Sequence, residues 1–255
     1  MFATVEFLLL CAILAIIWLG GRQRWHKRWF ETRRISEYLR HSPIMLLLGV
    51  ARPPGRWPKG AETAWPEFYA RASLRALGLP HTAVTPAYLR SALGELLDPH
   101  VVGQRDYHAA KAARLTSVHH KLDALSTRLF QLAIAAVSAY LVLTIAAGLA
   151  MVPHEWPHKA SYVFSFLGVL FPTLGAAIAG MRYFGDFERF AAISEVAAEK
   201  LDAVHARLML LLSAPDSAID YARAAELAHA TDEIVTSEIE SWQSVFGGKA
   251  ITVPV

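Results

Sequence analysis

Two uncharged stretches decide the fold: LFQLAIAAVSAYLVLTIAAGLAMV at residues 129–152 and YVFSFLGVLFPTLGAAIAGM at residues 162–181. Each is long enough for a helix that crosses a bilayer, because about 30 Å of hydrocarbon takes roughly 20 apolar residues. Only residues 153–161 separate the two stretches. We therefore expect a transmembrane hairpin over residues 129–181.

A third apolar stretch opens the sequence and carries no charge from Phe7 to Gly21 (FLLLCAILAIIWLGG). A cleaved signal peptide has a basic start and an A-x-A-like site after its apolar run. Here Glu6 is the only charge before the run, and a basic string beginning at Arg22 follows it at once. The pattern predicts a retained membrane anchor at residues 1–21.

The composition also favours a membrane protein. Of 255 residues, 54% are hydrophobic and 18% are charged, against about 25% charged residues in an ordinary soluble domain. The aromatic content of 11% excludes a disordered chain, which cannot bury enough apolar surface. The single cysteine, Cys11, excludes an intramolecular disulfide and a cysteine-based zinc cluster.

Basic residues predict the orientation of the spans. Residues 22–40 hold seven Lys and Arg against two acidic residues, whereas the hairpin turn holds only Lys159 and Glu155. Because Lys and Arg are enriched on the cytoplasmic side of a span, residues 22–128 and 182–255 are predicted to be cytoplasmic. The N-terminus and the turn are then outside. Four basic residues next to the first span suit anionic lipid headgroups: Arg22, Arg24, Lys27 and Arg28.

The segment between the first two spans predicts helices with irregular connections. Residues 22–40 are expected to form a helix that Pro43 and the string RPPGRWPKG (52–60) bring to an end. Residues 43–50 are expected to pack internally or to lie in the membrane interface. Two shorter helices are expected at 65–78 and 86–97. The second has Thr85 as its N-cap and Pro86 at its first helical position.

Apolar residues recur every three or four positions on both sides of the hairpin. Before it they are Leu115, Val118, Leu122, Leu125 and Leu129. After it they are Phe190, Ile193, Ala197, Leu201, Val204, Leu208 and Leu211. This spacing favours a coiled coil, so we expect both membrane helices to continue into the cytoplasm as a paired stalk. A last helix, about 217–246, carries Val235, Ile239, Trp242 and Phe246 on one face.

The predicted fold is thus an all-α integral membrane protein. It comprises an anchor (1–21), a basic cytoplasmic helical region (22–128), the hairpin (129–152 and 162–181) and an acidic cytoplasmic helical tail (182–255). Residues 22–128 hold 18 basic and 8 acidic side chains, and residues 182–255 hold 6 and 12, so that the net charge of +3 conceals two unequal parts. We expect these oppositely charged regions to pack on each other.

One motif carries enzyme chemistry by its letters alone. His154–Glu155–Trp156–Pro157–His158 matches the H-E-x-x-H signature of zinc proteases. That chemistry needs both imidazoles on one face of a regular helix, whereas Pro153 and Pro157 indicate a loop. Motifs for dinucleotides, for phosphates and for a serine nucleophile do not occur in the sequence. We predict that the protein is not an enzyme and holds no metal or cofactor.

Small and kink-forming residues within the hairpin are candidates for helix packing or for a pore. Residues spaced by four let membrane helices approach closely, and Pro172 beside Thr173 could kink the third span. Intrachain packing and a dimer contact are both open from the spacing alone. These hairpin candidates are Ala135, Ala139, Thr144, Gly148, Pro172, Thr173, Gly175, Ala176 and Gly180.

Four strings in fixed order carry a family resemblance: WFETRRISEYLR (29–40), GQRDYHAAKAARL (103–115), LFPTLGAAIAGMRYFGDFERFAAIS (170–194) and SEIESWQSVF (237–246). The set resembles the bacterial SLATT family of two-transmembrane effectors (SMODS- and SLOG-associated), close to the DUF4231 group. Besides Pro172, Gly175 and Gly180, the matching residues are Trp29, Arg33, Glu37, Arg40, Gln104, Tyr107, His108, Gly185, Asp186, Glu188 and Trp242.

The resemblance implies a membrane-perturbing or pore-forming effector of bacterial conflict or antiviral defence, in the inner membrane. Family members are thought to act beside nucleotide-sensing modules. Residues 1–255 carry an additional N-terminal span in place of a fused sensor domain, so two expectations stay open: the chain is not activated by a nucleotide, or a separate nucleotide-sensing or other defence protein is its partner. We expect a homo-oligomer in contact with lipid and no direct contact with nucleic acid. The alternatives are a channel or stator-like subunit with the span order of the MotA/TolQ/ExbB class, and a membrane scaffold that recruits a soluble sensor.

Overall fold

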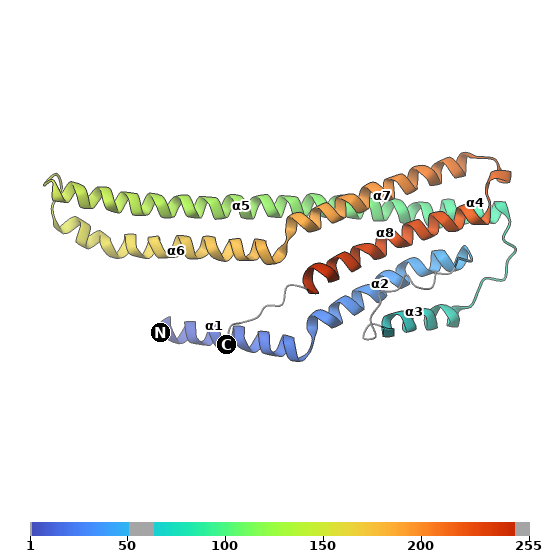
Figure 1. The fold of residues 1–255 in the computed structure, drawn as a ribbon, viewed down its shortest axis with the longest axis horizontal. Coiled ribbons are helices and arrows are strands. Elements are labelled where there is room, and N and C mark those ends of the chain that lie inside the picture. The colour runs from blue at the N-terminus through green and yellow to red at the C-terminus, as the bar shows by residue number, and fades with distance from the viewer. Residues whose placement is uncertain (1, 51–63, 248–255) are drawn as a thin grey trace. The chain divides into compact units, whose positions relative to one another are not determined.

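The computed structural model describes residues 2–50 and 64–247, and every regular element in these ranges is helical (Figure 1). No strand occurs among them, so the all-helical prediction is confirmed. The string at 52–60 lies outside the described residues. In chain order the elements are α1 (Phe2–Arg22), α2 (Trp25–Leu47), α3 (Ala64–Leu77), α4 (Pro86–Ala92), the π-helical turn η2 (Leu93–Leu97), α5 (Asp98–Gly148), α6 (Glu155–Gly185), α7 (Phe187–Ser213), the 3-10 turn η3 (Asp216–Ala218) and α8 (Tyr221–Gly247).

Three helical runs are long and apolar enough to cross a membrane: Ala3–Arg22, a part of Pro86–Gly148 and a part of Glu155–Ser213. The described residues form two compact units. One unit combines the chain up to Tyr107 with the chain from Val196 onward, and the other is His108–Glu195. The first unit contains the packed core, and the second contains the apolar hairpin.

The core of the first unit gathers leucines from segments far apart in the sequence. The end of α2, α4, η2 and the start of α5 contribute buried residues to this core, and so do α7 and α8. Burial of one such side chain contributes about 1.5–3 kcal/mol, so this cluster dominates the stability of the unit. Its largest fully buried apolar side chains are Leu48, Leu93, Leu97, Val101, Leu201 and Leu208.

The end of α2 is held by hydrogen bonds from two other helices. Gly49 adopts a φ of 69°, and the amides of Gly49 and Val50 donate to Leu46 O and Met45 O at 3.0 and 2.8 Å. This is the left-handed helix stop that glycine favours. The Tyr88 hydroxyl donates to Leu47 O (2.6 Å), and the Tyr221 hydroxyl donates to Gly49 O (2.5 Å). Carbonyls that the helix leaves open are thereby satisfied.

The second unit is built around an antiparallel pair of helices, α6 and the part of α5 from His108 onward, with most of its apolar side chains exposed (Figure 1). Gly175 is buried where the two helices approach, and a Cβ atom there would lie 3.8 Å from Ser126 O. The Ser126 hydroxyl donates to Gly175 O (3.3 Å), and Arg182 pairs with Asp123 at 2.5 Å. The hairpin therefore has one polar end and a long apolar body.

Two prolines do not act as the sequence suggests. α2 runs through Pro43, although a proline inside a helix costs about 3 kcal/mol. Tyr38, Met45 and Leu48, which precede and follow Pro43, are buried, and this packing outweighs the lost hydrogen bond. Residues 43–50 thus pack internally, as one of the two expectations had it. α6 begins at Glu155 with Pro157 in its first turn, where an amide would lack an intrahelical partner anyway. The predicted loop therefore ends earlier than expected.

The long helices after the hairpin are not continuous. Asp186, with a φ of 46°, ends α6, and α7 starts at Phe187. In the α7 seam, Phe190, Ala197, Leu201, Val204, Leu208 and Leu211 are buried. From Ala197 onward these residues belong to the core of the first unit. Of the seam before the hairpin, Val118 and Leu125 are exposed.

The basic and acidic regions pack on each other within the first unit, as predicted. α2 from the basic region lies against α8 from the acidic tail (Figure 1). Val235 and Ile239 of the last helix are buried and Trp242 is half-buried. The side chain of Phe246 lies outside the described residues. The N-cap predicted for α4 is confirmed, because the Tyr88 amide donates to the Thr85 hydroxyl at 3.2 Å.

Candidate functional site

Charged residues are buried between α2 and α8, and we call this group the polar seam. A buried charge is tolerated only when it is paired and hydrogen-bonded. α2 presents its charges every third residue, and α8 presents acids and a hydroxyl. The members of the polar seam are Glu31, Arg34, Glu37 and His41 of α2, and Thr231, Asp232 and Glu238 of α8.

Glu37 of the polar seam is clamped by two arginines on its own helix. Its carboxylate lies 2.9 Å from Arg33 Nη2 and 2.7 Å from Arg40 Nη1. The Glu37 side chain is 4% exposed, whereas both arginines reach solvent. Both oxygens are thus neutralised, and the carboxylate is fixed in place. The family-like spacing of Arg33, Glu37 and Arg40 forms one ion network, which stabilises α2 at its contact with α8.

Trp29 and Trp242 come together although 213 positions separate them in the sequence. Their ring centroids are 6.1 Å apart, within the range of favourable aromatic pairs. Trp29 also meets Phe30 edge-on at 4.9 Å. Five of the residues shared with the family resemblance (Trp29, Arg33, Glu37, Arg40 and Trp242) therefore lie along one helix pair.

A histidine pair that the sequence reasoning missed extends the polar seam toward α5. His41 Nδ1 lies 3.2 Å from His100 Nε2, and His41 Nε2 lies 3.2 Å from Ala228 O. Since a carbonyl only accepts, His41 Nε2 donates to Ala228, and His41 Nδ1 accepts from His100 Nε2 when both rings are neutral. Burial, the neighbouring His41 and Arg40 together lower the pKa of His100 to about 4. His100 is therefore neutral at physiological pH.

Arg90 on α4 fastens the end of α7. Its guanidinium donates to Leu212 O and to Ala214 O (2.6 Å), and it pairs with Asp216 at 2.8 Å. The last carbonyls of a helix lack hydrogen-bond donors within the helix. Arg90 donates hydrogen bonds to two carbonyls at the end of α7. The planar group with several donors suits this task better than a lysine ammonium.

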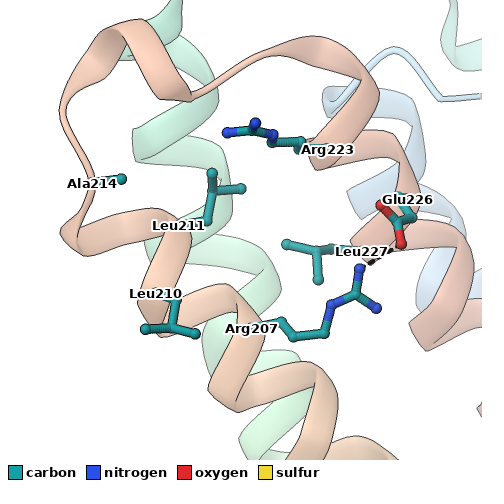
Figure 2. A pocket seen from close by; sticks show the side chains of 7 residues that line it. All are labelled: Arg207, Leu210, Leu211, Ala214, Arg223, Glu226 and Leu227. Atoms are coloured by element: carbon teal, nitrogen blue, oxygen red, sulfur yellow. Dashed lines mark hydrogen bonds and ion pairs between the residues drawn. The ribbon is translucent and has the colours of Figure 1, made fainter.

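A cavity of about 340 Å³ opens beside this turn, between α7 and the start of α8 (Figure 2). Leucines line it together with two arginines. Arg207 is bonded to Glu226 across the opening, and Arg223 donates to Ala218 O at 2.7 Å. Both cations are thus occupied by protein groups. The lining residues are Arg207, Leu210, Leu211, Ala214, Arg223, Glu226 and Leu227.

Most hairpin candidates lie on the outside of the α5–α6 pair. Ala135, Ala139, Thr144, Gly148, Pro172, Thr173 and Ala176 are exposed, Gly180 is half-buried, and Gly175 is buried. The small residues buried on α5 are instead Ala133, Ala136 and Ala147. Thr144 and Thr173 donate to carbonyls of their own helices, at 2.9 and 2.7 Å. Neither hydroxyl offers its hydrogen to a pore within one hairpin.

The other residues of the family resemblance lie on α5 and at the break after α6. His108 is buried, Gln104 is half-buried and Tyr107 is exposed. At the break, a Cβ on Gly185 would lie 2.6 Å from the Phe187 ring, so the ring requires a glycine there or a shift of its own. Asp186 takes the left-handed conformation, and Glu188 lies 3.9 Å from His119 Nε2.

The basic residues proposed for lipid contact lie where α1 meets α2. The Arg22 guanidinium stacks over the Trp18 ring at 5.2 Å, and Arg24 forms the left-handed turn between the helices. Arg28 is exposed and Lys27 is half-buried. Their charges follow directly on the apolar surface of α1, which is the placement that anionic headgroups require.

Among the described residues, no three His, Cys, Asp or Glu side chains gather as metal ligands. Glu155 of the H-E-x-x-H string is paired with Lys159 at 2.7 Å. Comparisons with protein-family models, with curated proteins and with solved structures found no match to the chain.

Proposed function

We propose that the chain is a non-enzymatic, oligomeric effector of the bacterial inner membrane, whose hairpin perturbs the bilayer or conducts through it. The observation that carries the proposal is the outward-facing apolar surface of the α5–α6 pair. Val142, Tyr162 and Val169 are among its exposed side chains. Apolar patches of this extent are not stable against water, whereas hydrocarbon requires them together with internally bonded helical backbone.

The link from the core to the hairpin supports an effector rather than a passive anchor. α5 is one helix of 51 residues, about 75 Å long at 1.5 Å per residue. Its beginning contributes fully buried Val101 to the core, and its end forms the hairpin. A partner that changes the packing of the core therefore acts on the same helix that crosses the membrane. The string-by-string resemblance to SLATT effectors supports the same function.

The chemistry of the hairpin supports action by several copies. Residues 129–152 and 162–181 contain no charged side chain, and Thr144 and Thr173 donate to their own helices. A single hairpin thus has no polar path across hydrocarbon. The exposed small residues Ala135, Ala139 and Ala176 suit contacts between hairpins of different copies.

Membrane potential is the direct test. Inducible expression in bacteria, together with the neighbouring genes as source of the trigger, is expected to depolarise cells that carry a potential-sensitive dye and to stop growth. Gly175→Val is expected to abolish most of the depolarisation, because its side chain enters the contact with Ser126 and Leu129. The matched control is Ala177→Val, at an exposed position two residues further along α6. Unchanged potential and growth with the wild-type chain would contradict the proposal.

A channel or stator-like subunit is the second candidate, favoured by the order of the apolar helices. One comes first, a long helical segment follows, and two more form the hairpin. Because residues 129–152 and 162–181 contain no Asp, Glu, Lys, Arg or His, such a subunit needs a partner that supplies an ionisable residue within the membrane. Native mass spectrometry of the detergent-solubilised protein separates the candidates: a pentamer that retains a partner with an ionisable span favours the stator, and a monomer or dimer excludes it.

A further inference from the structure

α3 has two apolar faces, and within the part of the chain that the structure describes only one of them is packed against another element. Pro66 and Ala70 are fully buried on the side that packs on α2 (Figure 1). The opposite side is exposed and follows helical spacing of three and four. We call this side the outer stripe; its residues are Trp65, Phe68, Tyr69, Ala72 and Ala76.

The outer stripe is too apolar to be an ordinary water-facing surface. Trp65, Phe68 and Tyr69 are 48%, 71% and 54% exposed. With about 200 Å² for each aromatic side chain, they alone expose roughly 350 Å². Contiguous apolar patches beyond a few hundred Å² mark interaction sites. Two such stripes facing each other would bury nearly half of a standard interface of about 1,600 Å² from aromatic surface alone.

The order of large and small residues along the outer stripe indicates which partner covers it. All three aromatic residues lie in the first half of the outer stripe, and both alanines lie in the second half. An antiparallel second copy of α3 therefore places Trp65 against Ala76 and Tyr69 against Ala72, and the twofold axis repeats both contacts. A parallel copy would set aromatic against aromatic and alanine against alanine, which leaves gaps that close packing does not tolerate.

Charge at the edge of the stripe agrees with the same arrangement. Glu67, Arg71 and Arg75 follow each other at intervals of four along one edge, and Glu67 pairs with Arg71 at 2.7 Å. In an antiparallel twofold pair, equal edges meet. Glu67 of one copy then lies level with Arg75 of the other, and the pair occurs twice.

We propose that α3 is a homodimerisation helix, with its outer stripe paired antiparallel against the outer stripe of a second copy. The inference adds an assembly surface outside the hairpin to the proposed function. Its test reads proximity between copies and not membrane potential, so either proposal can fail while the other stands.

Site-directed crosslinking of the full chain tests the pairing. In a Cys11→Ser background, Ala72→Cys lies close to the twofold axis and is expected to give a covalent dimer with a short bismaleimide in native membranes. Ser36→Cys, exposed on α2, is the matched control. If Ala72→Cys crosslinks no better than Ser36→Cys, another occupant covers the stripe and the proposal is overturned.

Sedimentation of the detergent-solubilised chain provides the second measurement. Phe68→Asp is expected to raise the dimer dissociation constant at least tenfold, whereas Leu210→Asp, which is also at a side chain 71% exposed, leaves it unchanged. Arg75→Glu is expected to weaken the dimer, and Glu67→Arg in the same chain to restore it. Dimers of equal strength in wild type and Phe68→Asp, with unaltered helix content, would overturn the proposal.

Discussion

α6 and α7 follow each other in the chain and are of similar length, but their apolar side chains suit different surroundings. In α7, charged residues such as Glu199 and Asp202 interrupt the apolar ones, and Leu201, Val204 and Leu208 are buried on one side. In the body of α6 no charge intervenes, and Val163, Phe166 and Val169 are exposed. The first pattern fits water on one side and protein on the other. The second fits a helix whose solvent is lipid.

The largest expected effect comes from leucine truncation in the two helices. Leu208→Ala in α7 is expected to destabilise the fold by about 2–5 kcal/mol, because it leaves a cavity in the core. Leu174→Ala in α6, where the side chain is 45% exposed, is expected to cost much less. Thermal unfolding in detergent, followed by circular dichroism, measures both. Equal losses would remove the distinction between the helices.

A lysine on the exposed face of each helix tests whether that face meets lipid or water. Val169→Lys puts an ammonium on the exposed face of α6 and is expected to oppose membrane insertion by about 3 kcal/mol. Leu210→Lys on α7 is equally exposed and is expected to be neutral. Carbonate extraction of membrane fractions compares the two variants. Full retention of Val169→Lys in the membrane would contradict a lipid-facing α6.

The end of α7 offers a smaller effect. Arg90→Lys is expected to destabilise the first unit by about 1–3 kcal/mol, because an ammonium cannot serve Leu212 O, Ala214 O and Asp216 together. Arg207→Lys is the control, since its bond to Glu226 is exposed. The same unfolding measurement applies. A loss no greater than that of the control would mean that the carbonyls find other donors.

The smallest expected effect is a pH dependence of the first unit. Burial lowers the pKa of His100 to about 4 in the folded chain, against 6.5 as its ordinary value. The unfolded chain therefore binds the proton first. Stability contributed by neutral His100 is complete above pH 6.5 and is lost as the pH falls toward 4. We expect a loss of about 1–2 kcal/mol, because the ring is partly exposed. His100→Gln should flatten this slope, and an unchanged slope would contradict the assignment.

The spans, the helical class and the start of α4 are predictable from sequence because their signals are local. An apolar run without charge needs no partner to be recognised, and Thr85 with Pro86 marks a helix start by itself. Pro43 misled because its local penalty is outweighed by long-range packing of Tyr38 and Leu48. Tertiary contacts decide such cases.

The candidate sites were less predictable, since their partners are remote. His41 and His100 are 59 positions apart, and no periodic pattern connects them. The resemblance indicated Trp29 and Trp242 separately, but only the fold shows that they touch. In the two uncharged spans, small residues occur on every face of the helix. Their spacing therefore does not indicate which face packs on the other helix. Ala133 and Ala136 are buried, whereas the candidates Ala135 and Ala139 are exposed.

The hydrogen bonds at the end of α2 act as a mechanical stop. Tyr88 and Tyr221 donate to Leu47 O and Gly49 O from positions 41 and 172 residues away. A slide of α2 along its axis by one helical turn, about 5.4 Å, breaks both of these hydrogen bonds at once. A pull on α1 that is transmitted along α2 is therefore opposed at the far end of α2 by both hydrogen bonds together.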